Sequence, residues 1–257
     1  MNNEQNEYRY FLRLSYLGTN YHGWQIQPGS VSVQELLQDA LSLILRTKIG
    51  VTGAGRTDTG VHAAVFYAHF DSIHCPESIR EMQLAFKVNR ILPPDIAVHD
   101  ILPVVIDAHA RFSATSRTYQ YHICTKKDPY RAGISWLYER ELDLKTMQEA
   151  AKRLFHHNDF ASFARSNTQV KTTICNIEQA SWTQKDHIIT FAVKADRFLR
   201  NMVRAMVGTM IDVGLGKHTP DGFEQIMLAR DRRKAGKSAP ACGLHLTGIE
   251  YPRELFI

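Results

Sequence analysis

The sequence predicts an α+β protein made of two halves, each with its strands and helices in the order β-α-β-β-α-β. Two observations predict this class. Apolar residues alternate with polar ones in several short stretches, as in half-buried strands, and recur every three or four positions in others, as in amphipathic helices. The 257 residues, 44% of them hydrophobic, are enough for one large domain or two small ones.

The first half opens with a strand over residues 8–16, where tyrosine and leucine occupy every second position. A helix follows, because Ser32 and Glu35 form a capping box in front of an apolar stripe over residues 36–45. The remaining elements are a short strand ending near Thr52, a strand over residues 61–70, a helix from Pro76 to about Arg90 and, after Pro93 and Pro94, a strand over residues 96–104.

The second half repeats that order. Tyr119, Tyr121 and Ile123 indicate a strand, and Asp143 is a plausible cap for a helix over residues 144–155. The remaining elements are a hairpin over residues 172–184 and 187–195 that turns at Lys185 and Asp186, a helix with Leu199, Met202, Val203, Met206, Met210 and Ile211 on one side, a helix that begins at Thr219 and Pro220, and a strand over residues 244–251.

The order of elements in both halves is the ferredoxin-like order, although no repeated residues support a duplication. We place the domain boundary between residues 105 and 106. If the two sheets lie side by side, loops from both halves can reach a central cleft. The glycine-containing loop before the strand over residues 61–70 would be the contribution of the first half.

Charge is distributed unevenly over a chain whose formal net charge is +5. Residues 1–105 contain 8 Lys or Arg and 10 acids, whereas residues 106–257 contain 23 and 16. This asymmetry favours a polyanion that contacts mainly the second half, although a solvated basic face gives the same pattern.

Cysteine usage and the N-terminal residues predict a cytoplasmic protein. Four cysteines are far apart in the sequence and form no C-x-x-C motif, so we expect reduced thiols and no structural zinc site. The first residues, MNNEQNEY, contain no basic or apolar region typical of an export signal. No apolar run approaches the roughly 20 residues of a membrane span, so we expect no membrane association.

The segment GAGRTDTGVHA, residues 53–63, places three glycines around the triplet RTD. A dinucleotide-binding loop would need glycine at Asp58, and a P-loop would need lysine after Gly60, where Val61 stands. Two interpretations remain. The segment is a glycine turn whose polar side chains bond their own backbone, or the glycines fix a carboxylate that acts as nucleophile or base.

The segment SATSRTYQYHI, residues 113–123, sets Arg117 close to Tyr119 and Tyr121. Tyrosine in a strand usually packs in the core, and we expect this of Tyr121. Interleaved aromatic and arginine side chains also stack on unpaired bases, so one of these residues is a candidate platform for a base.

Two further segments are rich in arginine. FLRNMVRAMVG, residues 198–208, places Arg200 and Arg204 on a helix whose other side is apolar, and Arg200 is expected at the surface. RDRRKAGK, residues 230–237, is a basic loop that is either a phosphate contact or a solvated tip.

The segment GRTDTGVHA, residues 55–63, resembles the signature around the catalytic aspartate of the tRNA pseudouridine synthases of the TruA family. Further segments resemble the other blocks of this family in the same order: YLGTNYHGWQIQP at 16–28, RFSATSRTYQYHI at 111–123, HNDFASFA at 157–164, FLRNMVRAMVG at 198–208 and APACGLHLTGIEYP at 239–252. Together they extend over nearly the whole chain. One departure is Thr59, where the family more often has alanine.

The resemblance implies the pseudouridine synthase fold and an isomerase that converts uridine to pseudouridine at positions 38, 39 and 40 of the tRNA anticodon arm. By the matching motifs, Asp58 would be the nucleophile, Tyr119 would stack on the target base and Arg204 would pair with Asp58. Arg56 would help to bind the RNA in the cleft, and Leu244 would pack beside the site. The resemblance further implies a homodimer, and the chemistry requires no cofactor and no metal.

A competing hypothesis is a non-catalytic RNA-binding protein of the same fold, in which Asp58 is purely structural. It predicts tRNA binding without formation of pseudouridine, and a lower melting temperature for Asp58→Asn.

Overall fold

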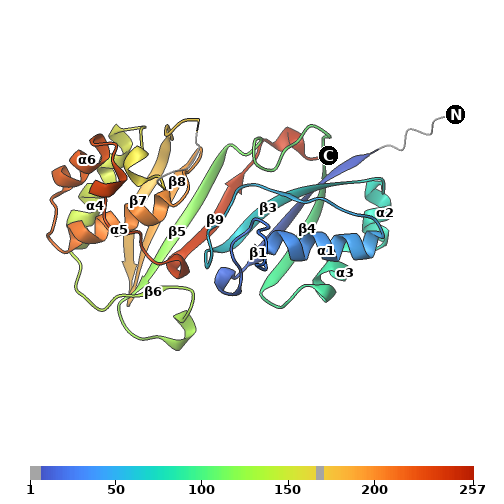
Figure 1. Cartoon of the computed structure of the whole chain (residues 1–257), viewed down its shortest axis with the longest axis horizontal. Coiled ribbons are helices and arrows are strands. Elements are labelled where there is room, and N and C mark those ends of the chain that lie inside the picture. The colour runs from blue at the N-terminus through green and yellow to red at the C-terminus, as the bar shows by residue number, and fades with distance from the viewer. Residues whose placement is uncertain (1–6, 166–170) are drawn as a thin grey trace. The chain divides into compact units, whose positions relative to one another are not determined.

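The computed structural model describes residues 7–165 and 171–257, so most of the N-terminal stretch MNNEQNEY lies outside the described residues. The chain divides into two compact units, the first comprising Met1–Thr115 with Thr247–Ile257 and the second Ser116–Leu246 (Figure 1). This division assigns residues 106–115 to the first unit. The domain boundary between residues 105 and 106 stays a prediction.

The sheet of the first unit has the central strand β1 (Tyr8–Tyr16) between β3 (His62–Ser72) and β4 (Ile96–Val104), both antiparallel to it. The two-residue strand β2 (Thr52–Gly53) pairs with β3, also antiparallel. The alternation of residues in β1 explains its place: Leu12 and Leu14 are fully buried, while Arg13 on the other face forms an ion pair of 2.6 Å with Asp100 on β4. β1, β3 and β4 confirm the predicted strands, whereas the short strand predicted to end near Thr52 instead begins there.

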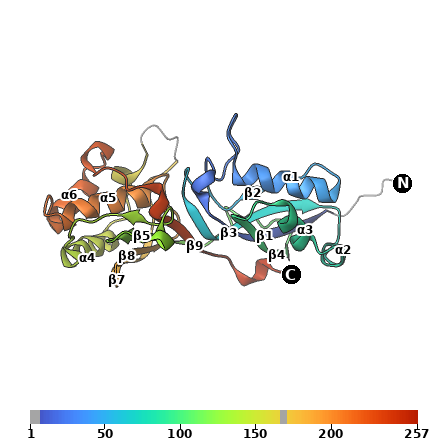
Figure 2. The ribbon, with the colours of Figure 1, turned by 90° about the horizontal axis from the view of Figure 1, so that it is seen from below.

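Helix α1 (Val33–Leu45) lies along one face of this sheet (Figure 2) and contacts α3. Ser32 caps it as predicted, because its Oγ accepts a hydrogen bond of 3.3 Å from the Glu35 N–H. Buried Leu37 and Leu41 supply its apolar stripe.

The single helix predicted from Pro76 to about Arg90 is wrong. The structure has two helices there, α2 (Pro76–Glu81) and α3 (Leu84–Ile91). Gln83 has a left-handed φ of 52° and its N–H bonds the Arg80 carbonyl, so the first helix ends before it. The break turns Leu84 into the core, where it is 1% exposed.

The sheet of the second unit has β8 (Ile188–Ala195) between β5 (Ser116–Cys124) and β7 (Ile177–Lys185), with antiparallel pairing on both sides. The short strand β6 (Trp136–Leu137) pairs parallel with β5, which makes the sheet mixed. Strand β9 (Leu244–Glu250) begins in the second unit and ends in the first. With its helices, this arrangement confirms the α+β class.

The helices of the second unit contact one another and are α4 (Leu144–Arg153), α5 (Met202–Gly214) and α6 (Pro220–Leu228). The predicted cap Asp143 accepts from the Lys145 and Thr146 N–H groups at 3.0 and 3.1 Å. The last helix begins at Thr219 and Pro220 as predicted, and the Thr219 hydroxyl accepts from the Gly222 N–H at 3.0 Å. Short 3-10 turns span Gly18–Asn20, Pro129–Arg131, Leu154–His156, Ala161–Phe163, Arg232–Lys234, Ala241–Gly243 and Arg253–Leu255.

Three predicted boundaries in this unit are wrong. β7 begins at Ile177 rather than at residue 172, because Ile174 forms only an isolated bridge with Asp159. The helix predicted from Leu199 begins only at Met202, after Asn201 takes a left-handed φ of 66°. Helix α4 ends at Arg153, and the last predicted turn is 3-10.

Within the described part of the chain, no helix has the length and apolar character needed to cross a membrane.

Candidate active site

The loop between β2 and β3 contains Asp58 in a tight turn. The Val61 N–H donates to the main-chain carbonyl of Asp58 at 3.1 Å, and Gly60 has a φ of 77°. A positive φ at the third residue of a four-residue turn is typical of type II and favours glycine there. The turn is therefore closed by main-chain atoms.

The same loop is fixed by the last residue of β1 and by the segment that follows β1. The Tyr16 and Thr57 hydroxyls form a buried hydrogen bond of 2.9 Å, and the main-chain N–H of Trp24 donates to the Thr57 carbonyl at 3.4 Å. On the other side of the turn, the Gly18 N–H donates to Nδ1 of His62 at 3.0 Å. Asp58 thus lies between two residues, at 57 and 62, whose side chains are anchored to another part of the first unit.

Two glycines of this neighbouring segment allow it to approach the loop closely. A Cβ at Gly18 would lie 2.0 Å from the Val61 carbonyl oxygen, and one at Gly23, whose φ is 85°, would lie 2.3 Å from the Thr57 carbonyl oxygen. Gly53 is needed for another reason, since a Cβ there would collide with the buried ring of Trp24. A Cβ at Gly55 would meet no atom within 4 Å, so the space around it does not require glycine.

Replacing Gly23 by alanine is expected to displace the Thr57–Asp58 backbone and to lower turnover at least about tenfold, because misplacing a reacting group by about 1 Å can cost up to a hundredfold. Gly29→Ala is the matched control. Gly29 has a similar φ of 72°, but its Cβ would meet no atom within 4 Å, so it reproduces the backbone strain without the collision. Steady-state turnover and the melting temperature of both variants distinguish displacement of the Thr57–Asp58 backbone from the backbone strain that both substitutions cause. Equal turnover in both would contradict this role of Gly23.

Tyr119 lies on β5 opposite Val193 of β8 and is half-buried. Its ring meets that of Phe198 edge to face, with centroids 5.2 Å apart. Tyr121, two residues further, is fully buried as predicted, and its hydroxyl donates to the Pro240 carbonyl at 2.7 Å. Burial raises the pKa of the Tyr121 phenol far above its usual range, so it stays a neutral donor.

Arg204 is half-buried in the first turn of α5 and is joined to Ala239 by two hydrogen bonds. Its Nε donates to the Ala239 carbonyl at 2.8 Å, and its own carbonyl accepts from the Ala239 N–H at 2.9 Å. Leu244, the first residue of β9, is 6% exposed. Gly243 before it packs against Tyr121, whose ring leaves no room for a Cβ there.

The site residues suggested by the sequence fall into two sets. Exposed Arg56 and half-buried Asp58 belong to one loop of the first unit, and Tyr119, Arg204 and Leu244 belong to the second unit. The pairing of Asp58 with Arg204 therefore stays a prediction. The motifs in the sequence did not indicate a site role for Tyr16, Gly18, Gly23 or His62. The available signal was the segment YLGTNYHG, in which two glycines flank the pair Tyr21 and His22.

A match to a family model and matches to similar sequences agree on one family. Residues 150–252 match the family model described as tRNA pseudouridine synthase. The chain is 51% identical over 249 residues to tRNA pseudouridine synthase A of Parabacteroides distasonis, covering 96% of this chain and 98% of that protein. This chain belongs to the tRNA pseudouridine synthase A family.

Other members of the tRNA pseudouridine synthase A family match as completely. The protein of Bacteroides thetaiotaomicron is 50% identical over 251 residues, which cover 96% of this chain and 92% of that protein. The protein of Bacillus subtilis is 37% identical over 242 residues, which cover 93% and 97%. Membership thus extends over both units and includes the Asp58 loop as well as the Arg204 helix.

Proposed function

We propose that this chain isomerises uridine to pseudouridine in tRNA, at positions 38, 39 or 40 of the anticodon arm. The observation that carries the proposal is the Asp58 turn: a carboxylate on a loop fixed by buried hydrogen bonds on both sides, within a chain of the tRNA pseudouridine synthase A family. Such a group is preorganised for attack or for proton abstraction.

The reaction breaks the bond between N1 of uracil and C1′ of the ribose, turns the detached base and joins C5 to C1′. The proton on C5 is lost and N1 gains one, so substrate and product have the same composition and the reaction needs no external oxidant, reductant or group donor. In our proposal Asp58 either attacks C1′ or removes the 2′ proton. Both routes use the ionised carboxylate, which a neighbouring arginine would favour.

The second unit would supply the residues around the base. Tyr119 would stack on uracil while it turns, and the edge-to-face contact with Phe198 supports a fixed ring orientation. Arg204 would pair with the Asp58 carboxylate through its terminal nitrogens, because its Nε is bonded to Ala239. Leu244 would pack beside the base and help to exclude water.

The strand arrangement within each unit supports two ferredoxin-like halves. In the first unit β2, β3, β1 and β4 are neighbours in that order and all antiparallel, which is the ferredoxin-like order. In the second unit β7, β8 and β5 repeat three of these positions. A homodimer that works in the cytoplasm, with its four cysteines as free thiols, completes the proposal.

Substrate binding would combine charge with base flipping. A uridine in or beside a stem must leave the stack, at a cost of a few kcal/mol, before C1′ is accessible. The basic surplus of residues 106–257 and exposed Arg56 would offset this cost through contacts to the RNA backbone.

Incubation of unmodified tRNA with the purified protein, followed by mapping of pseudouridine at single-nucleotide resolution, tests the proposal. We expect pseudouridine at positions 38, 39 or 40 and nowhere else in the molecule. tRNA that is bound but not modified would favour the non-catalytic RNA-binding alternative and overturn the proposed reaction.

For Tyr119 we expect Phe to keep most of the turnover and Ala to lose about 10- to 100-fold in kcat/KM. Stacking of a base on an aromatic ring contributes about 1–3 kcal/mol and needs the ring rather than the hydroxyl. Steady-state kinetics of both variants on the same tRNA measure this difference. Equal losses in the two variants would instead assign the role to the hydroxyl.

A further inference from the structure

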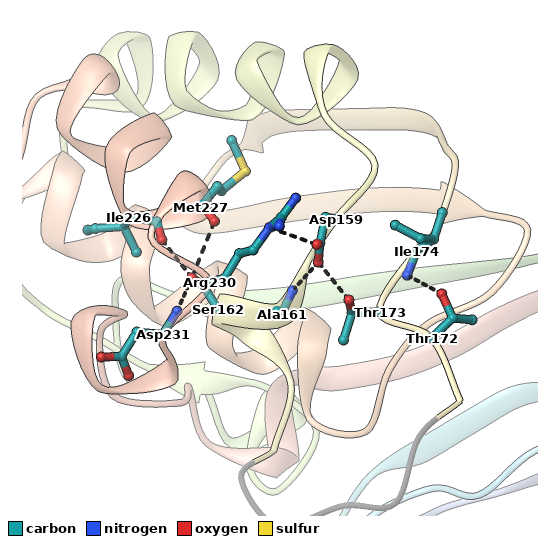
Figure 3. Close-up of polar contacts among 10 residues, drawn as sticks. All are labelled: Asp159, Ala161, Ser162, Thr172, Thr173, Ile174, Ile226, Met227, Arg230 and Asp231. Carbon is teal, nitrogen blue, oxygen red and sulfur yellow. Dashed lines mark hydrogen bonds and ion pairs between the residues drawn. The ribbon is translucent and has the colours of Figure 1, made fainter.

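The basic loop after α6, residues 230–239, is anchored at its start by two polar side chains (Figure 3). The fully buried Ser162 hydroxyl donates to the Ile226 carbonyl at 2.6 Å and accepts from the Asp231 N–H at 3.0 Å. Arg230 forms an ion pair of 2.8 Å with Asp159, which also accepts from the Thr173 hydroxyl at 2.7 Å. The loop is therefore fixed to the body of the second unit at the point where it leaves α6.

The side chain of Arg232 forms hydrogen bonds within the loop. Its Nη1 donates to the Gly236 carbonyl at 3.0 Å and to the Ala235 carbonyl at 3.3 Å, and its Nη2 donates to the Ser238 hydroxyl at 2.9 Å. Only a guanidinium offers several donors in one rigid plane for such a set of acceptors. The charge of Arg232 is thus directed into its own loop. By contrast, the side chain of Arg233 is exposed and pairs with Asp231.

The far end of the loop lies against α5. The Gly236 N–H donates to the buried Thr209 hydroxyl at 3.0 Å, and Asn201 donates to the Ser238 hydroxyl at 2.7 Å. A Cβ at Gly208 would lie 1.8 Å from the Lys237 carbonyl, so helix and loop are in direct contact. Immediately after this contact, Ala239 forms its two hydrogen bonds with Arg204.

We propose that Arg232 is a positioning residue for Arg204: it fixes residues 235–238 so that the Ala239 carbonyl holds the Arg204 Nε and directs the guanidinium. The expected effect on turnover rests on the proposed function, whereas the positioning of Arg204 by the loop does not. The interpretation of the loop as a set of phosphate contacts makes a different prediction, because it treats Arg232, Arg233 and Lys234 as equivalent charges.

Steady-state kinetics on tRNA distinguish a positioning role of Arg232 from a phosphate contact. Arg232→Gln is expected to lower kcat by about 10- to 100-fold with little change in KM, as expected for a misplaced catalytic arginine. Arg233→Gln removes the same charge one residue away and is expected to leave kcat nearly unchanged. Arg232→Lys keeps the charge but loses the fork, so its kcat stays low. The inference would be overturned if Arg232→Gln had normal kcat but a higher KM, with the salt dependence of tRNA binding reduced by about one phosphate contact. Arg232 would then be a contact to the RNA.

Two measurements separate positioning from loss of structure. In the Arg204→Lys background, Arg232→Gln should lower kcat little further, since both changes act on one group. Independently of activity, the ¹⁵N signal of the Arg204 Nε, assigned by its loss in Arg204→Lys, should shift and exchange faster in Arg232→Gln but not in Arg233→Gln. An unchanged Nε signal in Arg232→Gln, or additive effects of the two substitutions on kcat, would overturn the inference. If the unchanged chain modifies no tRNA, the proposed function is overturned, and the Nε signal alone then decides whether Arg232 positions Arg204.

Discussion

Asp58→Asn is expected to fold as the unchanged chain does and to release no tritium from tRNA labelled at C5 of uridine. The substitution keeps the shape of the side chain but removes the charge that, in the proposed mechanism, attacks C1′ or takes the 2′ proton. Loss of a nucleophile lowers turnover by at least about 10³-fold, or roughly 4 kcal/mol of activation free energy. Tritium release reports the C5 proton that leaves when C5 joins C1′.

Stability should change little, because the hydrogen bond that closes the turn uses the main-chain oxygen of Asp58 and the φ of Gly60. Asp39→Asn is the matched control, since it makes the same chemical change at an exposed position on α1. Retained tritium release in Asp58→Asn would overturn the assignment of the nucleophile. A large drop in melting temperature, with tRNA binding but no pseudouridine in the unchanged chain, would support a structural Asp58 in an RNA-binding protein.

Local signals in the sequence were enough for most elements. The alternation of residues 8–16 predicted β1 with its bounds, and the predicted caps Ser32 and Asp143 each accept the main-chain hydrogen bonds expected of them. These features depend on residues within one or two turns of each other, so they can be read without knowing the fold.

The errors lie where tertiary packing overrides local preference. Nothing about Gln83 indicates a left-handed φ; the conformation is stabilised because it lets Leu84 and Val88 reach the core after α2 has ended. β7 begins late for a similar reason. The residues before it bond the segment around Asp159; for example, the Cys175 N–H donates to the Asn158 carbonyl.

For the site, the sequence indicated a carboxylate fixed by glycines but not what fixes it. Gly60 has the positive φ that the turn requires, whereas Gly55 stands in open space. Support comes instead from Tyr16 and Gly23, more than thirty residues earlier, whose contact with Thr57 exists only after β1 and β3 have paired. Likewise, the charges of residues 230–237 gave no sign that Arg232 bonds its own loop.

Arg204→Lys is the second large effect that we expect. Lysine keeps the positive charge but cannot donate to the Ala239 carbonyl and to a carboxylate in one fixed plane. We expect kcat to fall roughly 100-fold, or about 2.7 kcal/mol of activation free energy, while KM changes only a few-fold. The measurement is steady-state and single-turnover kinetics on one tRNA, which separate the chemical step from binding.

Arg153→Lys is the control for this change. Arg153 also bonds carboxylates in the second unit, with Asp221 at 2.6 Å and Glu224 at 3.4 Å, but lies on α4 in a surface network. It should lose at most a few tenths of a kcal/mol in stability and nothing in turnover. Near-normal kcat in Arg204→Lys would contradict a close pair between Arg204 and Asp58. A rise in KM alone would instead make Arg204 a contact to the RNA backbone, and the geometry set by Ala239 would then serve binding rather than the chemical step.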